Sequence, residues 1–168
     1  LKILDGVSEG QQPFDRTLHF DSSEDLDREE IGKRLIENVK TLNQMLERNR
    51  QDFLEIRKSS AGSARAMNLR RRLRERRRRA VVLLEEVSIR TRKVQHLMKN
   101  LRRMLERINE LRAEIERSRK SAARSERVRR AREEIEETEL QAVEDRHELE
   151  QRVLAIEQRF EEYEDAKR

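Results

Sequence analysis

Apolar residues recur along this chain at alternating spacings of three and four, the pattern of helices that pack along one seam. The first such segment predicts a helix over residues 28–58. Its seam consists of Leu35, Val39, Leu42, Leu46, Asn49, Phe53 and Ile56. Asn49 is the one polar member, and a polar seam residue can fix the register of paired helices. Asp27 and Glu30 have the spacing of a capping box, so we place the helix N-cap at Asp27.

Two further stripes predict helices over residues 64–117 and 124–168, the first of them roughly 80 Å long. The seam of the first consists of Leu73, Arg77, Ala80, Leu84, Val87, Thr91, Val94, Met98, Leu101, Leu105, Ile108, Arg112 and Ile115. The seam of the second consists of Val128, Ala131, Ile135, Ala142, Leu149, Val153, Ile156, Phe160 and Tyr163, with Arg146 as an interruption. Glycine and proline are absent from Ser63 to Arg168, so we expect both helices to be continuous.

The apolar signal fails between residues 115 and 128, and we place a turn near residues 119–125. Helices joined by a short loop pack antiparallel. A reversal at this point brings residues 161–165 beside residues 75–79. The first of these segments is acidic and the second is strongly basic, so the sequence predicts charge pairing between them.

The sequence therefore predicts an all-α fold, a long antiparallel helical hairpin in a three-helix, coiled-coil-like arrangement. Residues 1–26 hold Pro13 and no long periodicity, so we expect them to form an extended arm. Residues 27–168 form the helical domain. The chain begins at Leu1 and stops within a helical pattern at Arg168, so we expect it to be a piece of a longer protein.

Composition supports long helices. Charged residues make up 45% of the chain and apolar residues 34%, while the formal net charge is only +5, which argues against disorder. No apolar run approaches the roughly 20 residues that span a bilayer. Cysteine is absent, which excludes a disulfide scaffold and a thiolate metal site and fits a reducing, cytoplasmic compartment.

No arrangement of residues predicts catalysis. The three histidines are scattered, no glycine loop could hold a phosphate, and no nucleophile–base pair is visible. We therefore predict no enzyme activity, cofactor, metal ion or small-molecule substrate. Long helices that present a surface to a partner are the favoured class.

The residues between 70 and 79 form the most basic run in the chain, with Glu75 as its only acid. This run contains Arg70, Arg71, Arg72, Arg74, Arg76, Arg77, Arg78 and Arg79. Such a run can neutralise the phosphates of nucleic acid or bind an acidic protein surface. The alternative, which the predicted acidic neighbour favours, is neutralisation within the protein. A leucine zipper after a basic region is disfavoured, because the zipper column would read Leu84, Thr91, Met98, Leu105.

Several segments resemble the primary sigma factors of bacterial RNA polymerase. They are Phe-Asp-Arg-Thr-Leu at 14–18, Ile-Glu-Asn-Val-Lys-Thr-Leu at 36–42, Leu-Glu-Arg-Asn-Arg-Gln-Asp-Phe at 46–53, Arg-Arg-Arg-Ala-Val-Val-Leu-Leu-Glu-Glu-Val-Ser-Ile-Arg-Thr-Arg at 77–92, and Tyr-Glu-Asp-Ala-Lys-Arg at 163–168. The resemblance implies that the chain covers the end of the first conserved region and the non-conserved helical insert before the second.

The resemblance implies a non-catalytic segment that supports transcription initiation. Its expected partners are core RNA polymerase and, through the full-length protein, promoter DNA. The helices that melt and read the promoter would follow Arg168, so no DNA-reading residue of the family is assigned here. The alternative function is a structural coiled-coil spacer or oligomerisation module without a nucleic-acid role.

Overall fold

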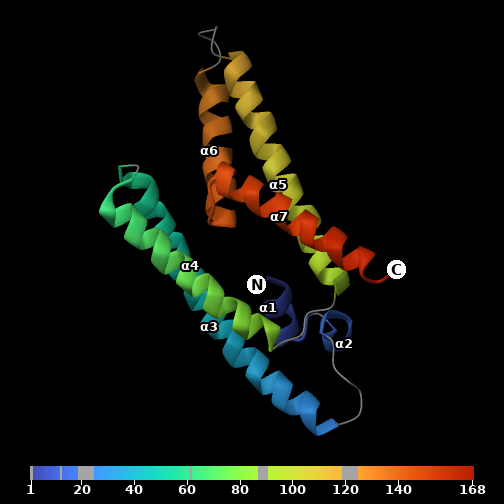
Figure 1. Cartoon of the computed structure of the whole chain (residues 1–168). Helices are drawn as coiled ribbons and strands as arrows, with labels where there is room; N and C mark the ends of the chain where they lie inside the picture. Colours follow the sequence, from blue (N-terminus) through green and yellow to red (C-terminus); the bar gives the residue numbers. More distant parts are fainter. Residues whose placement is uncertain (1, 12, 19–24, 61, 87–90, 119–124) are drawn as a thin grey trace. The chain divides into compact units, whose positions relative to one another are not determined.

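The computed structural model describes residues 2–11, 13–18, 25–60, 62–86, 91–118 and 125–168. Every helix or strand assigned within these ranges is an α-helix, which confirms the all-α fold class (Figure 1). The chain divides into two compact units, residues 1–94 and 95–168. Each unit has its own group of buried apolar side chains.

The first unit is built on an antiparallel hairpin of α3 (Asp25–Lys58) and α4 (Ala64–Glu85), which lie side by side in Figure 1. This pair confirms the predicted first helix and the reversal after it. The buried seam residues of α3 are Leu35, Val39, Leu42, Asn49, Phe53 and Ile56. At the start of α4, the Ser63 hydroxyl accepts a hydrogen bond from the amide of Ala66 at 3.2 Å. Gly62 adopts φ 79° in the connecting loop, a conformation that glycine tolerates without strain.

The predicted N-cap at Asp27 is wrong, because α3 begins at Asp25. The extended conformation predicted for residues 1–26 is wrong as well. This segment contains two short helices, α1 (Lys2–Ser8) and α2 (Phe14–Thr17). Helices this short depend on tertiary packing, because so few intrahelical hydrogen bonds cannot offset the cost of helix nucleation.

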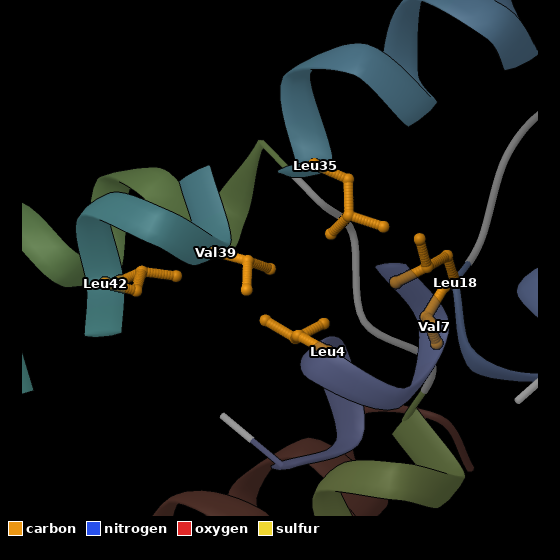
Figure 2. Packing of buried hydrophobic residues seen from close by; sticks show 6 residues of the cluster. All are labelled: Leu4, Val7, Leu18, Leu35, Val39 and Leu42. Atoms are coloured by element: carbon orange, nitrogen blue, oxygen red, sulfur yellow. The ribbon is translucent and has the colours of Figure 1, made fainter. Parts of the chain in front are cut away.

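That packing lies within the core of the first unit. Figure 2 shows the buried side chains of Leu4, Val7 and Leu18 gathered with those of Leu35, Val39 and Leu42 from α3. Partly buried residues near the end of α4 pack against this cluster, and they are Ala80, Leu83 and Leu84. The N-terminal segment is therefore part of the core of this unit.

The continuous helix predicted over residues 64–117 is wrong, because α4 ends at Glu85 and α5 spans Thr91–Ser118. Residues 87–90 lie outside the described residues. The sequence here contains two β-branched residues, Val87 and Ile89, which have low helix propensity because they lose rotamers in a helix. A helix can thus end without glycine or proline.

The second unit contains α5 from Gln95 onward, α6 (Ser125–Ala142) and α7 (Arg146–Asp165), so the third predicted helix is in fact two. Between them, Val143 adopts φ 57°, a left-handed conformation that is rare for a β-branched residue. Asp145 then caps α7, because its side chain accepts from the amide of Glu148 at 2.9 Å and the Glu148 side chain accepts from the amide of Asp145. This capping box begins a new helix after the turn.

The two helices of the C-terminal half both pack on α5. Arg107 on α5 forms an ion pair with Glu134 on α6, as a reversal near residue 121 predicts, while Arg102 on α5 pairs with Glu157 on α7. The core here consists of Ile108, Leu149 and Val153, with Leu101, Met104, Leu105, Ile135 and Ala142 packed against it. The predicted turn itself falls largely on residues 119–124, which lie outside the described residues.

The turn at Val143 also removes the basis for placing residues 161–165 beside residues 75–79. That register required an unbroken third helix. In the structure, Glu161 lines a groove within the second unit together with Met98 and Lys99 of α5. The continuous helix on which this register depended is thus wrong, and the charge pairing itself stays a prediction.

Candidate functional site

Helix α4 carries the eight predicted site residues, and its packing against α3 divides them into two groups. Because a helix turns every 3.6 residues, ten consecutive residues cover all of its faces. Ala66 and Leu73 are buried on the side toward α3. Arg70, Arg76 and Arg77 are half-buried. The exposed group, which we call the α4 arginine face, consists of Arg71, Arg72, Arg74, Arg78 and Arg79.

Arg76 is held inside the hairpin. Its Nε donates a hydrogen bond to Oδ1 of Asn49 at 2.7 Å, and its Nη2 forms an ion pair with Asp52. The side chains of Arg76 and Asp52 are only 14% and 16% exposed. Arg76 therefore joins α4 to α3, and its charge is neutralised within the protein, as the alternative interpretation of the run predicts.

The α4 arginine face is much less neutralised. Arg71 forms one ion pair, with Glu75 at 2.9 Å, in which both side chains are largely exposed. Exposed pairs of this kind contribute about 0–1 kcal/mol, so Arg71 can readily exchange its partner. Within the described part of the chain, no ion pair to an acid is formed by Arg72, Arg74, Arg78 and Arg79.

Arginines of the second unit contrast with this face, because many of them have acidic partners. Arg107 binds both carboxylate oxygens of Glu134, at 2.6 and 3.0 Å, which lowers the pKa of Glu134. At the start of α6, hydrogen bonds from Arg129 and Arg130 lower the pKa of Glu126 to about 2. On α4, by comparison, four exposed arginines without an acidic partner among the described residues lie within eight consecutive positions, at 72, 74, 78 and 79.

The α6–α7 corner holds an ion pair between a buried glutamate, Glu144, and a partly exposed arginine, Arg152, which the sequence did not predict. Glu144 is 2% exposed and accepts hydrogen bonds from Nε of Arg152 at 2.6 and 2.8 Å. This hydrogen bonding outweighs the effect of burial and raises the pKa of Arg152. The available signal was Asp145 followed by Glu148, a capping-box spacing that marks a helix start beside the Arg146 interruption.

The sequence did not predict the α5–α7 groove either, because the groove forms only when the chain turns before α7. It measures about 360 Å³. Its lining residues are Gln95, Met98, Lys99 and Arg102 of α5 and Glu157, Phe160 and Glu161 of α7. Met98 and Phe160 are half-buried and give the groove its apolar part.

Among the residues that the structure describes, no group of three or more His, Cys, Asp or Glu side chains is arranged to hold a metal ion. No described helix is long and apolar enough to cross a membrane. Comparison with protein-family models, curated proteins and solved structures finds no match to this chain.

Proposed function

We propose that this chain is a non-catalytic segment of a bacterial primary sigma factor, acting in the cytoplasm to support transcription initiation. In this proposal the α4 arginine face docks on a polyanion, either promoter DNA or an acidic surface of core RNA polymerase. The observation that carries the proposal is the set of exposed arginines on one helix, with Glu75 as the only acid between Arg70 and Arg79.

The arrangement suits a phosphate backbone. Arg71, Arg74 and Arg78 follow one side of the helix at spacings of three and four, and Arg72 and Arg79 follow another. Arg72 and Arg79 are separated by about 10 Å along the helix axis. Arginine side chains at such intervals can each neutralise a phosphate and release its counterions. Phosphate contacts fix position without reading sequence, so promoter choice lies elsewhere in the full-length protein.

The proposal predicts salt-dependent binding of the 168-residue chain to duplex DNA, measured by fluorescence anisotropy over a salt series. Each phosphate contact contributes about 0.9 to the slope of log K against log salt. The variant R72A/R74A/R78A/R79A should therefore lower the slope by about 3 to 4 and weaken binding at least tenfold at low salt.

A matched control removes the same charge from the second unit. Arg103, Arg112, Arg127 and Arg132 are exposed, and no ion pair involving them is seen among the described residues. Their fourfold alanine variant should retain the affinity and slope of the wild-type chain. Equal losses of affinity in both variants would mean that net charge alone determines DNA binding, which would contradict a specific binding surface on α4. Unchanged DNA binding with weakened binding to core polymerase would assign the face to the protein partner.

The family assignment has a separate test. The resemblance of residues 163–168 predicts that the full-length protein continues directly into a core-binding helix. A following sequence similar to Asn-Leu-Arg-Leu-Val would support membership of the sigma-factor family, and an unrelated sequence would argue against it.

The alternative function, a structural coiled-coil spacer, is favoured by one observation. Val94 and Leu97 occupy the apolar stripe of α5 but remain 40% and 41% exposed. A spacer predicts no measurable DNA binding at any salt concentration, so the same titration separates the two functions.

A further inference from the structure

The α5–α7 groove combines an incompletely covered apolar surface with two unlike charges. Met98 from α5 and Phe160 from α7 supply the apolar part, and both are only half-buried. Apolar side chains in such a position favour association, because a partner removes them from water.

The charged lining residues fall into two classes. Arg102 and Glu157 neutralise each other across the groove, with Nε of Arg102 donating to Oε1 of Glu157 at 2.8 Å. Lys99 on α5 and Glu161 on α7 are exposed, and within the described residues neither forms an ion pair. The groove therefore presents one cation from one helix and one anion from the other.

We propose that a second copy of this chain occupies the α5–α7 groove, forming a two-fold symmetric dimer. In a two-fold interface, if residue i of one copy contacts residue j of the other, then j of the first also contacts i of the second. Lys99 of each copy then faces Glu161 of the other. Each copy thus provides the partner for both exposed charges of the other copy. Met98 and Phe160 of the two copies pack together.

Charge complementarity is the reason for choosing a second copy over an unrelated helix. A foreign helix would need a carboxylate and a cation at matching positions, whereas a second copy supplies both by symmetry. Seven residues line the groove, whereas a standard interface contains about 20–30 residues on each side, so we expect a weak dimer that forms at micromolar or higher concentrations. The α4 arginine face takes no part, so the dimer does not depend on the proposed DNA contact.

Sedimentation equilibrium of the wild-type chain over a concentration series tests the proposal, and a concentration-dependent average mass is expected. The single variants Lys99→Glu and Glu161→Lys each place like charges at both symmetric contacts. Each should weaken self-association about tenfold or more, because like charges repel where opposite charges attracted. Far-UV circular dichroism confirms that each variant keeps its helices.

Mixing the two single variants gives the decisive measurement. In a heterodimer, one copy carries glutamates and the other carries lysines at both positions, so both contacts again join unlike charges. The mixture should recover the wild-type average mass, which an ion pair within one chain cannot achieve. The reversals Glu106→Lys and Arg112→Glu, at exposed α5 positions outside the groove, serve as controls and should leave self-association unchanged.

The proposal fails in three ways. A wild-type chain that stays monomeric at all concentrations would leave the groove to a different partner. Helical single variants that associate as strongly as the wild type would move the interface elsewhere. A mixture that stays monomeric would show that Lys99 and Glu161 do not meet across two copies. None of these outcomes bears on DNA binding by α4.

Discussion

Arg76 differs from the other arginines of its run in environment, although its charge is the same. It lies between α3 and α4 and binds Asn49 and Asp52, so it is a structural residue. The sequence identified Asn49 as the polar residue of an apolar seam. It did not identify Arg76 as the partner of Asn49. Any of the eight arginines of the run could have paired with Asn49, and the register of the hairpin decides which one does.

Replacing Arg76 with alanine should destabilise the first unit by about 1–3 kcal/mol, because Asn49 and Asp52 would lose their partner in a poorly hydrated position. Urea unfolding followed by circular dichroism measures the change. Arg72→Ala on the same helix is the control, and as a surface change it should stay within about 0.5 kcal/mol. Similar losses in both variants would contradict the structural role of Arg76.

Glu126 should titrate near pH 2, because hydrogen bonds from Arg129 and Arg130 lower its pKa from the ordinary 4.5. A lowered folded-state pKa means that these ion pairs stabilise the start of α6 fully above pH 4.5 and weaken as the pH falls toward 2. NMR titration of the side-chain carboxyl measures the value. In the double variant R129Q/R130Q the pKa should return toward 4.5, and a wild-type value already near 4.5 would refute the pairing.

At the scale of elements, the apolar seam of α3 was predictable and the helix breaks were not. The seam of α3 needs only a spacing of three and four, and six of its seven members are buried. The turn at Val143 has no glycine or proline to mark it. Its left-handed conformation accompanies two helix-ending hydrogen bonds, from the amide of Glu144 to the carbonyl of Glu139 at 3.1 Å and from the amide of Val143 to the carbonyl of Leu140 at 3.3 Å. The helical state of residues 2–8 was hidden similarly, because it depends on contacts with distant α3.

The α7 capping box gives a prediction at this scale. Replacing Asp145 with alanine removes the acceptor for the amide of Glu148 and should cost about 1 kcal/mol. Hydrogen exchange of the first-turn amides of α7 should quicken about fivefold as a result. Asp145→Asn is the control, because asparagine caps helices about as well as aspartate. Unchanged exchange in Asp145→Ala would mean that the cap does not hold this turn.

At the scale of the molecule, the sequence predicted that a basic surface exists but not its extent. Which arginines are exposed follows from the packing of α4 on α3, and the α5–α7 groove follows from the reversal at Val143. Both depend on contacts between residues far apart in the chain. Local periodicity carries no information about them.

Two separate cores predict two separately stabilised units. Leu149 is fully buried in the second unit, so Leu149→Ala should cost about 2–5 kcal/mol there. Hydrogen exchange should then quicken across residues 95–168 and stay unchanged in α3. The reciprocal variant, Leu35→Ala in the first core, should quicken exchange in α3 alone. Equal effects of either variant on both units would indicate one cooperative molecule.

Leu4, Val7 and Leu18 of the N-terminal segment cover the apolar side chains of α3 in the first unit. Truncating the N-terminal segment for crystallisation would expose Leu35, Val39 and Leu42 to solvent. A chain that starts at residue 25 should therefore aggregate and bind to chromatography resins more than the intact chain does. Affinity tags are consequently better attached behind Arg168 than spliced in place of the leading segment.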